Sequence, residues 1–380
     1  MKHLMDEQLS QLLSIPMAPF RELYVLDWVR GILTQNKIPY FQDQTGNIVI
    51  GFKSSSEYKK RLAKKANQPL RIFIAHLDHP GFHGVKWISK NVLETKWLGG
   101  NPTANLEGSK VWISSLHLHE THEGKVTSAT LHSHGKSIKS ALIECDSDVS
   151  DMNAEELFGG FGFQSPAWQE DELIYTKAAD DLIGVYSILE TALKLWKAKS
   201  PARALFAGLL TRAEEVGFIG TLGHLDEYFT KPVKTPIAVV SLETSKTLPG
   251  AEIGKGPVVR LGDRSTVFHP GFTQLLTGLA KKLLPDKHQR RIMDGGSCEA
   301  TAATVIGLPA IGISVPLGNY HNIGENGPAP EFIHINDIAG MKTLCYGLMT
   351  QKLNWNNPWL EQQKDFKNLL KENKPWLKSK

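Results

Sequence analysis

The chain has 380 residues, of which 41% are hydrophobic and 22% charged, and its formal net charge is +4. This length exceeds what one hydrophobic core usually supports, so about two structural units are expected. No apolar run is long enough to cross a bilayer, which excludes a protein built from transmembrane helices. The small charge excess, without a motif that interleaves aromatic and basic residues, predicts no nucleic-acid or membrane partner.

Cysteine usage and the N-terminal segment both favour a cytoplasmic protein. Cys145, Cys298 and Cys345 are widely spaced and form no CxxC pair, so neither a disulfide framework nor a structural zinc site is predicted. The opening segment, MKHLMDEQLSQLL, is charged and lacks the apolar core and the small-residue cleavage site of a secretory signal. We therefore expect reduced thiols and a cytoplasmic location.

Apolar periodicity predicts the main elements in chain order. Leu9, Leu12 and Leu13 share a helical face, a second helix is predicted over residues 20–35, and a polar turn at 44–47 predicts a β-hairpin. Four later runs are short and continuously apolar, as in parallel strands buried on both faces: residues 71–75, 204–210, 236–242 and 310–315. Helices over 182–198 and 272–284 would supply crossovers. The predicted fold class is α/β, with a mostly parallel central sheet flanked by helices.

The interval 84–173 differs from the rest, because its segments are short, partly alternating and separated by glycine or polar turns. It predicts a small inserted β-barrel-like domain, which would leave 1–83 and 174–355 as one discontinuous α/β domain. Residues 356–380 form a lysine-rich tail. Its apolar residues fit an amphipathic helix, for which docking on the body is preferred over docking on a partner.

Each strand candidate leads into acidic or imidazole side chains. His76 and Asp78 follow the first strand, and Asp180 precedes a helix. Glu214 and Glu215 follow the second strand, Glu243 follows the third, and His321 comes after the last. Because ligands bind at the carboxyl ends of parallel strands, we expect these groups to meet at one edge of the sheet.

This combination of imidazoles and carboxylates, without thiolates, suits divalent ions of borderline hardness. Zn²⁺ is favoured, with Co²⁺ or Mn²⁺ as alternatives. One Asp, two Glu and two His suffice for two ions that share an anionic ligand. Asp78 is placed to orient the His76 ring. Glu214, next to a ligand, is the predicted general base that takes a proton from water and passes it to the leaving amine.

These motifs resemble the family of tetrahedral and glutamyl aminopeptidases. The resemblance runs through TGNIVIGF, AHLDHPGF, KAADDLIGV, TRAEEVGFIGT, IGKGPVV and GGSCEATAATVIGLPAIGISVP to NYHN. It implies that Asp180 bridges two metal ions, that His76 and Glu243 complete one site, and that Glu215 and His321 complete the other. It further implies release of N-terminal residues from short peptides by a metal-bound hydroxide. The insert, which lies between His76 and Asp180, would assemble the chain into a homo-oligomer.

Three departures from the family pattern affect substrate preference more than the metal set. Glu243 stands where the family usually has Asp, the typical GGTDA segment appears as GGSCEA at residues 295–300, and Asn319 and Tyr320 replace an Arg-Tyr pair. The preferred N-terminal residue therefore stays open.

Other interpretations are retained. Asp180, taken alone, fits a helix cap better than a metal ligand. Cys298 is expected to be a small packed residue rather than a nucleophile, since no base is evident. The insert histidines, including His119 and His122, fit a solvated face. Two alternative functions are a metal-dependent deacylase or carboxypeptidase acting on another amide, and a catalytically silent oligomeric scaffold.

Overall fold

The structure is a computed structural model that describes residues 4–117, 120–147 and 149–378. Its body is built around a large mixed sheet with the strand order β1-β2-β12-β3-β13-β16-β19-β11-β10, to which β14 and β15 are added beside β16. The four central strands, β12, β3, β13 and β16, are parallel, whereas the outer pairings on this path are antiparallel.

The strands of this sheet have the following bounds: β1 Tyr40–Gln42, β2 Ile48–Ile50, β3 Leu70–His76, β10 Ala167–Glu170, β11 Leu173–Thr176, β12 Phe206–Thr211, β13 Ile237–Lys246, β14 Val258–Asp263, β15 Gln289–Met293, β16 Ala310–Gly318 and β19 Glu331–His334. The α-helices are α1 Glu7–Ser14, α2 Leu23–Gln35, α3 Ser55–Leu62, α4 Leu182–Lys197, α5 Ile219–Phe229, α6 Pro270–Leu283, α7 Glu299–Val305, α8 Ile335–Thr350 and α9 Leu360–Asn373.

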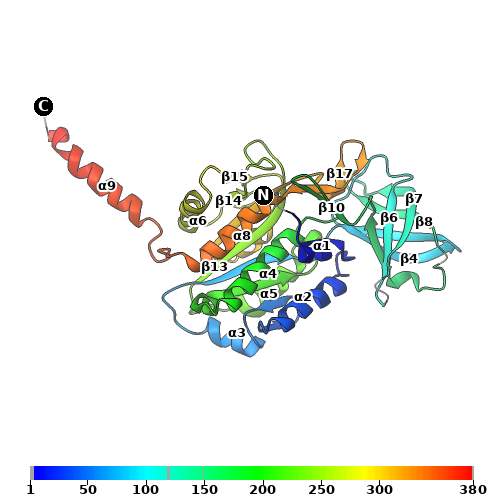
Figure 1. The fold of residues 1–380 in the computed structure, drawn as a ribbon, viewed down its shortest axis with the longest axis horizontal. Helices are drawn as coiled ribbons and strands as arrows, with labels where there is room; N and C mark the ends of the chain where they lie inside the picture. Colours follow the sequence, from blue (N-terminus) through cyan, green and yellow to red (C-terminus); the bar gives the residue numbers. More distant parts are fainter. Residues whose placement is uncertain (1–3, 118–119, 148, 379–380) are drawn as a thin grey trace.

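Helices cover both faces of the central sheet (Figure 1). Phe73 and Ala75 of β3 join a core formed with α1, α2, α4, α6 and α8. The alternate residues Ile72 and Ile74 pack instead with side chains of α3, α5 and α7. All seven residues of β3 are buried, which explains why the strand is apolar apart from Arg71 and His76.

The second unit is a closed barrel with the strand order β4-β5-β8-β7-β6-β9. Its strands are β4 Gly81–Ser89, β5 Val92–Leu98, β6 Lys110–Ser115, β7 His122–Leu131, β8 Ile138–Cys145 and β9 Leu157–Phe161. A separate apolar core, which includes Phe82, Trp97 and Ile143, fills it. Figure 1 shows the barrel at one end of the molecule, beside the helical layers.

The predicted fold class is confirmed: a large, mostly parallel sheet is flanked by helices, and a separate barrel accompanies it. The division at residues 84–173 stays a prediction; the barrel strands run from Gly81 to Phe161, and β10 and β11 pair within the large sheet. One detail was wrong. β13 continues to Lys246, so Glu243 lies inside this strand rather than after it.

Docking of the tail on the body was also predicted, and the structure contradicts this. No residue of α9 is buried, and Figure 1 shows the helix extending away from the sheet towards the C-terminal end of the chain. Within the described residues, no helix is long and apolar enough to cross a membrane. His119 of the histidine-rich insert lies outside the described residues.

Close packing of β9 against its neighbours predicts a marked effect of one added methyl group. A Cβ at Gly159 would lie 2.1 Å from the Trp112 carbonyl oxygen and 2.4 Å from Cζ of Phe82. We expect Gly159→Ala to lower the free energy of unfolding by about 1–3 kcal/mol, measured by urea denaturation. Gly278→Ala is the control, because nothing lies within 4 Å of its Cβ position in α6. That control should gain about 0.5–1 kcal/mol; equal stability of both variants would contradict the packing argument.

Candidate metal centre

The predicted ligands reach one edge of the sheet from separate elements. His76 is the last residue of β3, and Thr211, which pairs with it in β12, is followed by the short helix η3 Glu214–Val216. Asp180 lies between β11 and α4, and His321 lies in η4 Tyr320–Asn322 after β16. Parallel strands end together, so residues far apart in the sequence converge here.

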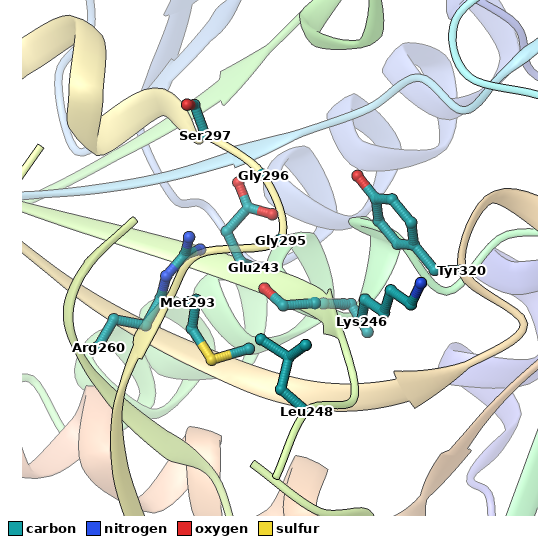
Figure 2. Close-up of a pocket in the computed structure, with 11 residues that line it drawn as sticks. Glu243, Lys246, Leu248, Arg260, Met293, Gly295, Gly296, Ser297 and Tyr320 are labelled. Atoms are coloured by element: carbon teal, nitrogen blue, oxygen red, sulfur yellow. The ribbon is translucent and has the colours of Figure 1, made fainter. Parts of the chain in front are cut away.

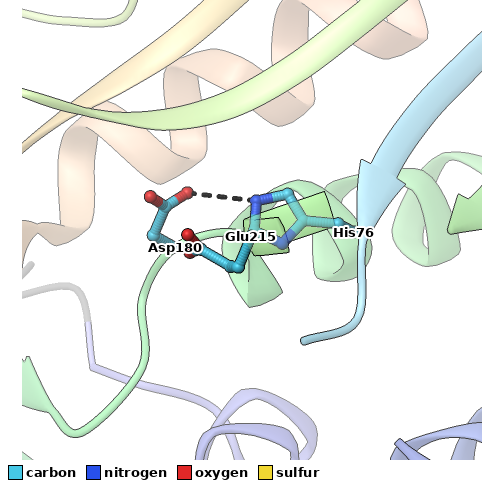
Figure 3. A group of neighbouring side chains, drawn as sticks. All are labelled: His76, Asp180 and Glu215. Carbon is cyan, nitrogen blue, oxygen red and sulfur yellow. Dashed lines mark ion pairs between the residues drawn. The ribbon is translucent and has the colours of Figure 1, made fainter. Parts of the chain in front are cut away.

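Asp180 lies between the two histidines. Its Oδ1 is 3.5 Å from Nε2 of His76, and its Oδ2 is 3.6 Å from Nε2 of His321. Figure 3 shows the first of these contacts, together with Glu215. Each carboxylate oxygen therefore faces a different imidazole, an arrangement that suits a bridging ligand.

The remaining carboxylates lie on either side of Asp180. Oε2 of Glu215 is 3.2 Å from Nε2 of His321, and Oε2 of Glu214 is 3.9 Å from Nε2 of His76. One oxygen each of Glu214 and Glu243 lies within 4.8 Å of a ring nitrogen of His76 and of the other. The five predicted ligands and Glu214 thus form one continuous cluster.

Asp78 supports both sides of this cluster. Nδ1 of His76 lies 3.1 Å from the Asp78 carbonyl oxygen and 3.7 Å from Oδ1 of the Asp78 side chain. The Asp78 carboxylate also accepts hydrogen bonds from the backbone N–H groups of Glu214, at 2.9 Å, and Glu215, at 3.2 Å. Asp78 therefore holds the turn that carries the paired glutamates, a contact beyond the ring orientation expected from the sequence.

Glu331 in β19 is a supporting residue that the sequence interpretation missed. Its carboxylate accepts hydrogen bonds from the backbone N–H groups of Ala179 (2.6 Å), Asp180 (3.2 Å) and His321 (2.8 Å). It therefore ties the loop before α4 to the loop after β16. Burial raises the pKa of Glu331 to about 8, with a further contribution from the Asp180 carboxylate. No local motif marked this acid, because two of its three backbone partners, Ala179 and Asp180, lie more than 150 residues away in the sequence.

The neighbouring Asp181, rather than Asp180, caps α4. Oδ1 of Asp181 accepts a hydrogen bond from the backbone N–H of Gly184 at 3.1 Å. It also accepts one from the Thr244 hydroxyl at 3.1 Å. The capping interpretation considered for Asp180 therefore applies to the next residue, and the Asp180 side chain is left to face the histidines.

Burial and mutual repulsion dominate the electrostatics of the cluster. Burial raises the pKa values of Glu214 and Glu243 well above the usual range, and nearby carboxylates raise them further. Burial by itself would lower the pKa of His321, but the Glu215 and Asp180 carboxylates raise it to about 10. The protein thus concentrates negative charge at a site that a cation would stabilise.

Buried polar atoms without a hydrogen-bond partner indicate whether the cluster could hold metal ions. Among the described residues, four buried cluster atoms have no hydrogen-bond partner: Oδ1 of Asp180, Oε1 of Glu215, Oε1 of Glu243 and Nε2 of His321. Buried polar atoms are normally satisfied, so such a group needs a partner. Carboxylate oxygens and imidazole nitrogens are the donors that Zn²⁺, Co²⁺ and Mn²⁺ accept. The residues present therefore fit divalent cations.

A pocket opens beside this cluster (Figure 2). Glu243, Lys246, Arg260, Gly296 and Tyr320 are among the residues that line it. Arg260 is only 2% exposed, and its Nε and Nη1 have no hydrogen-bond partner in the described part of the chain. The Tyr320 ring stacks on His321 with ring centroids 3.7 Å apart. The pocket therefore joins the ligand cluster to a buried guanidinium.

Cys298 is unsuited to nucleophilic chemistry. It is buried, and burial raises the pKa of its thiol far above the usual value. Its backbone N–H donates to Oδ2 of Asp263 at 3.1 Å. The thiol is therefore part of the packing that supports the loop at residues 295–300.

Comparisons with known proteins agree with this architecture. The Pyrococcus horikoshii TET1 peptidase, which can assemble into a tetrahedron or a large octahedral shell, matches 91% of this chain and 99% of its own, with 18% identity and a TM-score of 0.71. A TET aminopeptidase from Thaumarchaeota archaeon SCGC AB-539-E09 matches 93% of this chain and 98% of its own, with 17% identity and a TM-score of 0.72. An aminopeptidase from Desulfurococcus kamchatkensis matches 92% of this chain and 94% of its own, with 18% identity and a TM-score of 0.67.

At these low sequence identities, the structural matches establish the fold alone. The family of the chain follows instead from a match to a family model. The model described as M42 glutamyl aminopeptidase matches residues 59–344, which is more than half of the chain and includes every predicted metal ligand. The chain therefore belongs to the M42 glutamyl aminopeptidase family and is an enzyme that hydrolyses peptide bonds.

Proposed function

We propose that the protein is a dinuclear metal-dependent aminopeptidase that removes N-terminal residues from short peptides. The observation that carries the proposal is the position of Asp180, whose two carboxylate oxygens face His76 and His321. His76 and Glu243 would hold one cation, and Glu215 and His321 the other. Zn²⁺ is the preferred ion, with Co²⁺ or Mn²⁺ as alternatives.

When bound, the two cations would supply Lewis acidity for the scissile carbonyl and lower the pKa of water. Glu214 would act as general base and then deliver the proton to the leaving amine. Its carboxylate lies 3.9 Å from Nε2 of His76, and its backbone N–H donates a hydrogen bond to the Asp78 carboxylate. Burial raises the pKa of Glu214 well above its usual range, which favours uptake of a proton by this carboxylate.

The cluster also bears on the alternative functions. A deacylase would accept substrates without a free α-amine, whereas an aminopeptidase needs that amine. In a catalytically silent scaffold, a buried group of carboxylates that repel one another would destabilise the fold without serving a reaction. We further propose a cytoplasmic homo-oligomer that assembles through the barrel, by analogy with the structural relatives that form large shells.

Arg260 supports a preference for acidic N-terminal residues. Its buried guanidinium retains unpaired donors and lines the pocket next to Glu243. A carboxylate side chain entering that pocket could accept hydrogen bonds from this group, as guanidinium and carboxylate geometries match. The family description, glutamyl aminopeptidase, names the same class of residue.

Glu214→Gln tests the catalytic proposal. The amide cannot take a proton, so we expect kcat to fall by about 10²–10⁴-fold while metal binding is retained. The measurement is release of free amino acids from unblocked and N-acetylated short peptides, with and without added Zn²⁺, Co²⁺ or Mn²⁺. The exposed Glu325→Gln is the matched control.

The substrate panel separates the functions in the same experiment. Metal-dependent cleavage of unblocked peptides alone would support the aminopeptidase. Equal cleavage of the N-acetylated peptides would favour the deacylase, and a chain that binds metal but turns over nothing would favour the scaffold.

Glu331→Gln tests support of the metal centre without removing a ligand. The amide loses one of the two carboxylate oxygens that hold the Asp180 and His321 backbones, so we expect affinity for Zn²⁺ to fall by about 10–100-fold. Competition with a chromogenic chelator measures this directly. Exposed Glu252→Gln should leave the affinity unchanged, and an unchanged affinity in Glu331→Gln would exclude the supporting role.

Arg260→Met tests the substrate preference. Loss of one partner of a buried charged pair should reduce kcat/KM for peptides with N-terminal Glu by about 30-fold or more, and leave those with N-terminal Leu within about threefold. Arg290→Met, at an exposed arginine, is the control. A wild-type enzyme that prefers Leu over Glu would rule out this assignment of Arg260.

A further inference from the structure

A second cavity lies where the barrel meets the body of the molecule. It has a volume of about 180 Å³, and β6, β7, the segment after β9, the loop after α1 and Lys177 contribute to its lining. None of its lining residues lines the pocket beside the metal cluster. Figure 1 shows α1 and β10 next to the barrel at this junction. The cavity is therefore a separate feature, with no role in the proposed reaction.

Aromatic side chains give this cavity an apolar lining. Trp112 comes from β6, Phe161 is the last residue of β9, and Phe163 follows two residues later. An apolar cavity of about 150 Å³ is large enough to bind benzene. The cavity therefore has room for one aromatic ring or one branched aliphatic group of a ligand.

The cavity also reaches a buried amine. Lys177 is only 5% exposed, and its Nζ lies 5.4 Å from the centroid of the Trp112 ring. This Nζ donates a hydrogen bond to the backbone carbonyl oxygen of Ile15 and lies 3.6 Å from Sδ of Met17. Neither partner carries a charge, and an ammonium group has three donors. These contacts therefore position the amine without compensating its charge.

No acid compensates the charge of Lys177 within the part of the chain that the structure describes. No carboxylate there forms an ion pair with its Nζ within 4.0 Å. Burial without such a partner lowers the pKa of Lys177 to about 7. Lysines are almost never fully buried unless they are paired. An anion in the cavity would supply the missing partner.

The charges around the cavity favour an anion of a particular kind. Lys110 lines the cavity together with Lys177, whereas Glu123 is the one acid among the described lining residues. An inorganic anion would leave the aromatic lining unused, and a purely apolar molecule would leave the amine uncompensated. A carboxylate attached to an apolar group satisfies both parts of the cavity.

We propose that this cavity is a binding site for a small carboxylic acid with an aromatic or branched apolar body. The carboxylate accepts a hydrogen bond from Nζ of Lys177, and the apolar body packs against the aromatic side chains. A free apolar amino acid and a simple carboxylic acid both offer this chemistry. The site is separate from the metal centre and does not depend on the proposed catalytic function.

Calorimetric titration of the full-length protein in the presence of Zn²⁺ tests the site. The probes are 3-phenylpropanoate and the uncharged 3-phenylpropanamide, which share one apolar body. We expect the acid to bind and the amide to bind about tenfold more weakly or less, because hydrogen bonds to an ionised group are the stronger ones. L-Phenylalanine is a third probe that separates the two sources. Binding as tight as that of 3-phenylpropanoate would identify an amino-acid site, and weaker binding a site for simple acids.

Three variants locate the bound acid. Lys177→Met should weaken binding of 3-phenylpropanoate by about tenfold or more, because the carboxylate loses its charged partner. Phe163→Ala should weaken it by about tenfold through loss of apolar contact, and this variant leaves the Lys177 side chain in place. Arg260→Met, which changes the pocket beside the metal cluster, is the control and should leave the affinity unchanged.

Several results would overturn the proposal. Equal affinity for the acid and the amide, or no binding of the acid up to about 10 mM, would exclude recognition of a carboxylate. Unchanged binding in Lys177→Met, or loss of binding in Arg260→Met, would place the acid elsewhere. If Lys177→Met does not fold, the two probes titrated into the wild type and Phe163→Ala still decide. None of these measurements uses peptidase activity, so a failure of the catalytic proposal stays distinguishable.

Discussion

Burial of several carboxylates at one sheet edge is the constraint on which the rest of this structure depends. Asp180, Glu214, Glu215 and Glu243 share the site with the imidazoles of His76 and His321, and repulsion between the carboxylates must be balanced. The parallel strands bring these groups together from distant parts of the sequence, and helices on both faces exclude water from the sheet beneath. Two bound cations would compensate the charge and satisfy the four unpaired donor atoms.

Other buried acids hold the backbone rather than the metal. Glu22 binds the Arg212 guanidinium at 2.8 Å and accepts a hydrogen bond from the Ala213 N–H at 3.0 Å, just before the paired glutamates. Ala213 and His321 both adopt positive φ values, 52° and 57°, which non-glycine residues rarely do. Such conformations persist only where the surroundings fix them. Glu22, Asp78 and Glu331 are positioned to do so.

The convergence of the candidate ligands was predictable, because side chains that follow parallel strands meet at the same edge of the sheet. His76 and the paired glutamates directly follow apolar strands, so their convergence required only that the strands be parallel. Glu22 and Glu331 were not predictable in this way, since each accepts a hydrogen bond from a backbone N–H group more than 150 residues distant. The sequence pattern also could not predict the position of α9, because it indicates an amphipathic helix but not the surface that covers its apolar face.

In the proposed function, Glu243 would connect the metal centre to substrate recognition. It lies within β13, three residues before the strand ends, and its side chain belongs both to the ligand group with His76 and to the lining of the adjoining pocket. A glutamate has one more methylene than the aspartate usual in the family, which carries its carboxylate farther from the strand. The buried Arg260 lines the same pocket (Figure 2). If the Glu243 carboxylate lay against Arg260, it would neutralise the guanidinium charge. Among the described residues, however, no ion pair within 4.0 Å joins Glu243 and Arg260. The Nε and Nη1 groups of Arg260 thus keep no hydrogen-bond partner among the described residues. In the proposed function, Glu243 would separate the metal ions from the guanidinium that recognises the substrate.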